Sequence, residues 1–267
     1  MKTNHSNHKR LSDHILIVKI GGRVAENEQQ LGGILDGLAD PKQPVIFVHG
    51  GGKQATKVAD VLGVKSQMID GRRVTNSAML DVAIMVYGGL INKNIVAQLE
   101  SRGRKALGMT GADMGIIHSV KRSPHPIDFG YVGDIESINT EELIVLLERG
   151  IIPVLAPLSS DGSGQLLNTN ADNIAAHVAS ALAEQSSYHV SLNLCFDLEG
   201  VMIDGKLCRN LDPEGFLDAR DDGQISGGMI PKIEVGFKAA KAGVDPVRIV
   251  HPRDLHVEDA GTYLRLE

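Results

Sequence analysis

The sequence predicts an α/β fold in which helices cover a mostly parallel sheet, and three observations predict it. Five short apolar runs rich in β-branched residues lack clean alternation, as expected of strands buried on both faces. Amphipathic helical patterns lie between these runs. Glycine reaches 30 of 267 residues, in clusters that often follow the runs. The predicted strands are residues 15–20, 45–48, 151–156, 190–195 and 247–250.

Three segments between these strands have the apolar spacing of amphipathic helices. Residues 53–62 carry their apolar side chains on one stripe and are followed by Gly63, a residue suited to ending a helix. Residues 172–184 and 229–242 show the same pattern, and Gly243 stops the second of them. Such alternation of strands and helices places ligands at the carboxyl ends of the parallel strands.

Residues 75–102 form a fourth and longer helical candidate that is apolar all round. A helix without a polar face is buried on both sides, whereas the outer helix of a sandwich meets its own sheet with one face only. We therefore expect the other face to contact a second copy in a two-fold homodimer. Gly88-Gly89 inside the helix predicts a close helix crossing.

Composition excludes some functional classes and favours a cytoplasmic protein. Asp and Glu number 33 against 27 Lys and Arg, and aromatic residues make up only 3%, which argues against nucleic acid as a partner. Cys195 and Cys208 lack the spacing of a redox or metal motif, so we expect buried reduced thiols. The apolar run at residues 15–18 is too short for a signal peptide, so no membrane association is expected.

Two glycine clusters that follow predicted strands are candidate anion sites. Lys19 precedes Gly21-Gly22, and a lysine in an apolar strand needs a partner unless the strand is an edge strand whose lysine reaches water. His49 is followed by Gly50-Gly51-Gly52 at the start of a helix, where bare N–H groups bind anions, although tight turns also use such glycines.

Two further segments combine polar residues with a helix start. Residues 168–172 read Asn-Thr-Asn-Ala-Asp, which exceeds what one helix cap requires, although a cap alone remains an alternative. Residues 227–232 read Gly-Gly-Met-Ile-Pro-Lys and place Lys232 in a first helical turn, where the helix dipole disfavours a cation. Lys232 in that position indicates that an anion binds nearby.

Common phosphate and metal motifs do not explain these segments. The sequence has no GxxxxGK[ST] string, so it is not a P-loop protein, and its ten histidines show no metal-binding spacing. Asp128-Phe129-Gly130 spells the metal-binding tripeptide of protein kinases. However, no GxGxxG loop precedes it, and the rest of that motif set is out of order.

In their order along the chain, these segments resemble the amino acid kinase family, and within it the members that act on an acylated glutamate. The resemblance runs from about residue 14 to the end. The matching motifs are Lys19-Ile20-Gly21-Gly22, His49-Gly50-Gly51-Gly52, Gly71-Arg72-Arg73-Val74, Asn168-Thr169-Asn170-Ala171-Asp172 and Gly227-Gly228-Met229-Ile230-Pro231-Lys232.

The resemblance implies an open αβα sandwich of two lobes, with residues 14–170 binding the acyl-glutamate and residues 171–267 binding ATP after a disordered tail at residues 1–13. It implies catalytic roles for Lys19, Lys232 and Asp172, and substrate binding by Gly51, Gly52, Arg73 and Asn168. It further implies nucleotide binding by Gly21, Gly22, Asp197 and Gly228. Mg²⁺ would arrive on the ATP phosphates, without a protein metal site. Phe196 departs from the small hydroxyl residue that many relatives carry, so the contacts around Asp197 are the least certain.

The implied reaction is ATP-dependent phosphorylation of the γ-carboxylate of N-acetyl-L-glutamate, a step of arginine biosynthesis. The residues leave N-succinyl-L-glutamate open as the substrate, and a silent nucleotide-binding regulator is an alternative from another class. The segment Tyr131-Val132-Gly133 is a candidate lid. The short, poorly helix-forming segment 1–14 further leads us to expect no inhibition by arginine, because arginine-sensitive relatives use an additional N-terminal helix.

Overall fold

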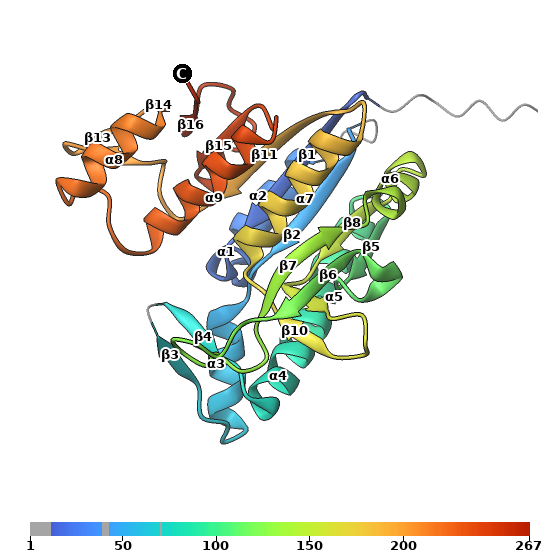
Figure 1. Cartoon of the computed structure of the whole chain (residues 1–267). Coiled ribbons are helices and arrows are strands. Elements are labelled where there is room, and N and C mark those ends of the chain that lie inside the picture. Colours follow the sequence, from blue (N-terminus) through green and yellow to red (C-terminus); the bar gives the residue numbers. More distant parts are fainter. Residues whose placement is uncertain (1–11, 39–42, 70) are drawn as a thin grey trace, which may run out of the picture.

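A computed structural model describes residues 12–38, 43–69 and 71–267 (Figure 1). Residues 1–11 lie outside the described residues, so the expected disordered tail, and the arginine insensitivity inferred from it, stay predictions.

An eight-stranded sheet forms the centre of the molecule. Neighbouring strands pair in parallel except for β15 and β16, which confirms the predicted mostly parallel sheet. The order across the sheet is β14 (Asn210–Leu211), β16 (Thr262–Leu264), β15 (Val247–Val250), β11 (His189–Cys195), β1 (His14–Ile20), β2 (Val45–His49), β8 (Ile152–Leu155) and β5 (Ala106–Met109).

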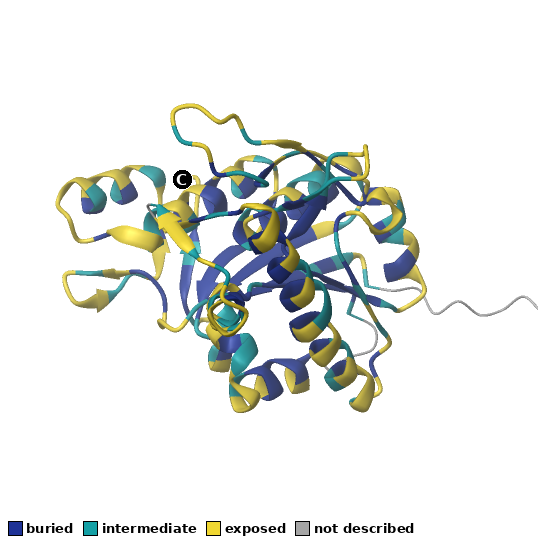
Figure 2. Cartoon of the chain, turned by 90° about the horizontal axis from the view of Figure 1, so that it is seen from below, coloured by how far each residue is buried: buried dark blue, intermediate teal, exposed yellow. Residues whose placement is uncertain are grey.

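Helices cover both faces of this sheet, which confirms the αβα sandwich. Alternate residues of β1 face opposite layers: Ile15 and Ile17 belong to one buried cluster, and Val18 and Ile20 to the other. Most residues of the central strands are accordingly buried (Figure 2). The first layer holds α6 (Thr140–Glu148), α7 (Ala171–Gln185), α8 (Pro213–Asp221) and α9 (Ile230–Lys241). The second holds α1 (Gly22–Glu26), α2 (Glu28–Gly37), α3 (Gly52–Val61) and the long helix 77–101.

The sheet divides near residue 171. Strands that precede this residue (β1, β2, β8 and β5) form one half, and strands that follow it (β11, β15, β16 and β14) form the other. The two halves meet where β1 pairs with β11. Strand order therefore reverses at the β1–β11 boundary, and a crevice outside the carboxyl ends of strands at such a point is where open α/β sheets bind ligands.

The predicted strands and helices all occur, with ends shifted by one or two residues. The long candidate at residues 75–102 is a continuous helix made of α4 (Ser77–Ala83), a π-helical segment (Ile84–Ile91) and α5 (Asn92–Ser101). Gly88-Gly89 lies inside the π-helical turns. Among the described residues no helix crosses closely at this point, so the close crossing stays a prediction for the contact with a second copy. A Cβ on Gly88 would make only ordinary contacts, and one on Gly89 would meet nothing within 4 Å.

The same helix is long and apolar enough to cross a membrane by length and composition alone. However, half of its most apolar window is buried inside the molecule. Packing against the central sheet accounts for the buried half of its apolar residues.

A second, four-stranded sheet was not predicted. Its order is β10 (Leu166–Asn168), β9 (Leu158–Ser160), β6 (Ile117–Lys121) and β7 (Gly133–Ile138), and it lies over the carboxyl-end side of the first half of the molecule (Figure 1). These strands are short and partly exposed, so they lack the apolar runs that identified the central strands. Two hairpins complete the fold: β3 (Gln67–Ile69) with β4 (Arg72–Val74), and β12 (Met202–Ile203) with β13 (Lys206–Leu207).

Candidate active site

Lys19 is buried in the central sheet and paired with a carboxylate. It shares its strand face with Ile15 and Ile17, so the alternation of β1 directs its side chain toward α7. Its Nζ lies 2.5 Å from Oδ1 of Asp172, and the residue is only 4% exposed. The alternative that Lys19 reaches water from an edge strand is wrong, because β1 lies between β11 and β2.

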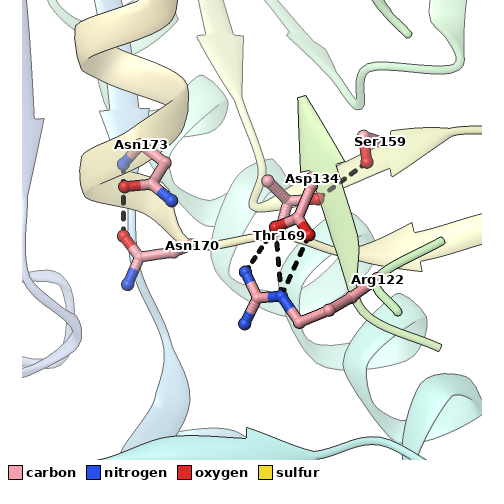
Figure 3. Close-up of polar contacts among 6 residues, drawn as sticks. All are labelled: Arg122, Asp134, Ser159, Thr169, Asn170 and Asn173. Atoms are coloured by element: carbon pink, nitrogen blue, oxygen red, sulfur yellow. Dashed lines mark hydrogen bonds and ion pairs between the residues drawn. The ribbon is translucent and has the colours of Figure 1, made fainter. Parts of the chain in front are cut away.

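Asp172 stands in the first turn of α7, and a neighbouring residue caps that helix. The Oδ1 atom of Asn170 accepts a hydrogen bond of 2.7 Å from the backbone N–H of Asp172. It also accepts one of 3.2 Å from the backbone N–H of Asn173 (Figure 3). Asn170 therefore serves as the helix cap, the alternative that the sequence left open. Its role leaves the Asp172 carboxylate free to face the lysines.

Lys232 completes the charged cluster from α9, which packs against α7. Its Nζ lies 3.7 Å from Oδ2 of Asp172 and donates a hydrogen bond of 3.0 Å to the carbonyl of Gly228. Burial lowers the pKa of Lys232, and the nearby charge of Lys19 lowers it further, while Asp172 opposes both effects. The structure thus brings together all three predicted catalytic residues, from a strand and two helices.

A cavity of about 190 Å³ opens beside this cluster. It lies at the carboxyl ends of β1 and β11, the point where strand order reverses. Three cations against the single carboxylate of Asp197 give its lining a net positive charge, which suits a polyphosphate. It is lined by Lys19, Gly21, Gly22, Arg23, Val24, Phe196, Asp197 and Lys232.

The glycines at the ends of β1 and β2 allow two backbone turns to touch. A Cβ on Gly22 would lie 3.0 Å from the Cα of Gly51, and one on Gly51 would lie 2.4 Å from Cδ1 of Ile91. A side chain on Gly22 would push the two turns apart, and one on Gly51 would collide with Ile91 and Tyr87 of the long helix. Both glycines are therefore needed for close approach rather than for unusual dihedral angles. The first turn of α3, which begins at Gly52, is thereby held next to the cavity.

Arg73 is buried on β4 and contacts the start of α3. Its Nη2 donates hydrogen bonds of 2.7 Å to the carbonyl of Gly52 and 2.9 Å to Oγ1 of Thr56, and its Nη1 donates to Oγ of Ser66. Two predicted substrate-binding residues, Arg73 and Gly52, are therefore in direct contact. Ser66 and Thr56 were not predicted, because a lone hydroxyl residue carries no signal without its partner.

Asn168 contacts Thr75, the residue that directly follows β4. Its Nδ2 donates a hydrogen bond of 2.9 Å to Oγ1 of Thr75, and its backbone N–H donates to the carbonyl of Tyr131 at 2.9 Å. Thr75 in turn receives the N–H of Tyr131 at 2.7 Å. The candidate lid residues 131–133 therefore run directly beside Asn168. Thr75 was missed although it follows the Gly71–Val74 motif immediately.

Three of the four predicted nucleotide-binding residues line the cavity, and the fourth does not. Gly21, Gly22 and Asp197 line the cavity, and Oδ2 of Asp197 accepts a hydrogen bond of 3.0 Å from Nη1 of Arg23. Gly228 is exposed and is not among the lining residues. It contacts the cluster through its carbonyl, which accepts the hydrogen bond from Lys232.

Two titratable residues near the site are buried and uncharged at neutral pH. Burial lowers the pKa of His49 to about 4, and its ring contacts the carbonyl of Gly50 at 3.0 Å and Nδ2 of Asn92 at 3.2 Å. Burial also raises the pKa of Cys195 to about 12, which agrees with an inert reduced thiol.

Comparison with known proteins assigns the family. The model of the amino acid kinase family matches residues 14–251. The chain belongs to the amino acid kinase family. Among its relatives, the acetylglutamate kinase of Phocaeicola vulgatus is 44% identical over 96% of this chain and all of its own length. The acetylglutamate kinase of Bacteroides fragilis is 42% identical over 96% of this chain and 99% of its own length.

The amino acid kinase fold is also seen in a solved structure. The protein smu.665 of Streptococcus mutans superposes with a TM-score of 0.80 at 29% identity, covering 95% of this chain and 99% of that one. The family and the αβα architecture inferred from the motifs are thus both confirmed.

Proposed function

We propose that this chain catalyses ATP-dependent phosphorylation of the γ-carboxylate of N-acetyl-L-glutamate, a step of arginine biosynthesis. The observation that carries the proposal is the pairing of Lys19 and Lys232 with one carboxylate, Asp172, beside a cavity at the strand-order reversal. The two acetylglutamate kinases that match nearly the whole chain support the choice of substrate.

The chemistry needs charge stabilisation rather than a general base. A glutamate side chain, with a reference pKa of about 4.3, is already an ionised nucleophile at neutral pH. The barrier is the approach of this carboxylate to a triphosphate whose equatorial oxygens stay negative during transfer. Lys19 and Lys232 offset that repulsion, and Asp172 holds both ammonium groups in place before the substrates arrive.

In this proposal, each half of the sheet binds mainly one of the two substrates. Residues 171–267 contribute most to ATP binding and supply Asp197 and Gly228. Gly21 and Gly22, from the other half, also lie near the phosphates and ribose. Residues 14–170 bind the acyl-glutamate through Gly51, Gly52, Arg73 and Asn168. The phosphoryl group then crosses the β1–β11 boundary, where Lys19 stands.

Mg²⁺ enters this proposal bound to the nucleotide. Among the described residues that line the cavity, Asp197 alone carries a carboxylate, and it is paired with Arg23. Within the described ranges, no group of three or more His, Cys, Asp or Glu residues could hold a metal ion. Phosphate oxygens are therefore the main ligands available to the ion, which neutralises part of the triphosphate charge.

The test is a steady-state assay of ADP release with acetylglutamate and succinylglutamate run side by side. Hydroxylamine in the mixture would capture the acyl phosphate as a hydroxamate, which separates transfer to a carboxylate from ATP hydrolysis. We expect turnover with acetylglutamate at the higher kcat/KM. A higher value with succinylglutamate would reassign the acyl group, and no turnover with either would favour a silent regulator.

Arg73 gives a prediction for substrate binding. Arg73→Ala should raise the KM for the acyl-glutamate about 10-fold to 100-fold, because a hydrogen bond to a charged group contributes about 1.5–3 kcal/mol. The KM for ATP should change far less. Arg72→Ala is the matched control, since Arg72 is the exposed neighbour in the same strand. Equal changes in both KM values would remove Arg73 from the acyl-glutamate site.

We also propose that the protein is a cytoplasmic homodimer that uses the outer face of helix 77–101. Met85 and Leu90 are 51% and 45% exposed on this face, so a partner could bury them. Ala83 and Val86 are 0% and 1% exposed and lie in the protein's own core. Substitutions at these two positions would therefore disrupt folding rather than test the dimer.

Met85→Asp and Leu90→Asp should convert the dimer to a folded monomer, because each places a charge in the proposed interface. Light scattering at micromolar concentration measures the mass. Leu217→Asp is the control, since Leu217 is 45% exposed on α8, which belongs to the opposite helical layer. A wild-type monomer, or variants that all remain dimeric, would refute this interface.

A further inference from the structure

The ring of Phe196 lies against both lysines of the candidate active site. Its centroid is 4.8 Å from Nζ of Lys19 and 4.6 Å from Nζ of Lys232. Ammonium groups within about 6 Å of an aromatic centroid are attracted by the negative face of the ring. One aromatic side chain therefore contacts the two cations that the reaction needs.

Phe196 is fixed in this place from several sides. It follows β11 directly, and its backbone N–H donates a hydrogen bond of 3.0 Å to the carbonyl of Val250 on β15. Its side chain packs partly against the buried cluster under α7 and α9 and also lines the cavity. The ring thus has a defined position between the protein core and the space beside the lysines.

We propose that Phe196 is a positioning residue that holds Lys19 and Lys232 together as cations at the mouth of the reaction site. The inference rests on the proposed function, since it assigns the two lysines to phosphoryl transfer. It adds a role for a side chain that the charged cluster alone does not explain.

The charge balance of the cluster explains why an aromatic ring, rather than a second carboxylate, holds the two lysines. Two ammonium groups share one carboxylate, that of Asp172, so the cluster retains one net positive charge and an internal repulsion. A second carboxylate would relieve the repulsion but cancel the charge that must attract the phosphoryl oxygens. The face of an aromatic ring stabilises a cation without carrying a formal charge. Phe196 therefore holds the lysines while leaving their net charge available.

Fluorination of the ring isolates this effect from packing. Mono-, di- and trifluorophenylalanine, installed at position 196 alone, nearly preserve the ring's size but progressively weaken its negative face. We expect kcat/KM for ATP to fall stepwise by about threefold to tenfold across the series, the range that a partly desolvated cation–π contact supports. A ring that only fills space would give no trend, and that result would overturn the proposal.

The pH profile supplies a second readout. The groups that face Lys232 are Asp172 from α7 and Lys19 from β1, with the Arg23–Asp197 pair across the cavity. These groups are unchanged in the fluorinated series. Weakening the ring's attraction for the cation should move the alkaline limb of kcat/KM, where Lys232 loses its proton, to lower pH. An unmoved limb would contradict a contact with the cation.

Substitutions of Phe196 by other natural amino acids complete the test. Phe196→Tyr keeps an aromatic face and should retain most activity, whereas Phe196→Leu should lose it without loss of the folded state. Phe216→Leu is the control, because Phe216 is a buried ring in the same half of the sheet that contacts Phe237 and lies outside the cavity lining. It should lower stability but leave the pH profile unchanged. Equal activity of Phe196→Tyr and Phe196→Leu would count against the ring's role.

A binding experiment separates failure of the proposed function from failure of the inference about Phe196. Binding of a non-hydrolysable ATP analogue, measured by calorimetry, does not depend on the acceptor substrate. If the wild-type chain phosphorylates neither acyl-glutamate, the proposed function fails, yet the fluorinated series should still weaken binding of the analogue if Phe196 holds the lysines. Unchanged binding across that series would overturn the inference itself.

Discussion

Lys19→Ala and Lys232→Ala should each lower kcat by about 10²–10³, the loss expected when one preorganised donor to a developing negative charge is removed. Both ammonium groups reach the same cavity and share Asp172, so each contributes charge that a water molecule cannot replace in this partly desolvated place. The KM values should change less than kcat, because the lysines act most strongly in the transition state.

The measurement is steady-state kinetics with both substrates saturating. Lys238→Ala is the matched control, because Lys238 stands on the exposed face of the same helix as Lys232. It should keep the wild-type kcat. If either lysine variant also keeps it, that lysine has no part in the chemistry.

Asp172→Ala should lower the free energy of unfolding by about 3–5 kcal/mol, the cost of leaving one member of a buried ion pair without its partner. Lys19 is buried in the central sheet and would lose its 2.5 Å contact. The kcat should fall by about 10² as well, since both ammonium groups lose the residue that orients them. Denaturant unfolding and steady-state kinetics measure the two effects.

Two further variants separate stability from catalysis. Lys19→Met combined with Asp172→Leu should restore much of the stability, because apolar residues often replace a buried pair without loss, but not the activity. Asp36→Ala removes a partner from an exposed pair with Arg102 and should cost less than about 1 kcal/mol. Wild-type stability in Asp172→Ala would show that the buried pair contributes nothing to the fold.

The central architecture could be predicted from the sequence because its signals are local. A strand buried on both faces must be apolar at every position, so the run at residues 15–20 identifies β1 without knowledge of its neighbours. The end of such a run marked Lys19, and polar residues at helix starts marked residues 168–172 and Lys232. The family resemblance then implied catalytic roles for Lys19, Asp172 and Lys232. The second sheet could not be predicted, because β6 and β7 are partly exposed and their pattern follows from what covers them.

The sequence by itself determined the αβα class, the family and the identities of the charged residues, since each depends on short segments in a fixed order. Only the tertiary structure decided which residues meet. It assigned the helix cap to Asn170, which leaves Asp172 for the lysines. It also placed Ala83 and Val86 in the core, and it brought Phe196 against both ammonium groups. The Asn170 cap is local, but the contacts of Phe196 with Lys19 and Lys232 join segments that are far apart along the chain. The packing of α7 and α9 on the sheet creates these contacts, so no local pattern in the chain can encode them.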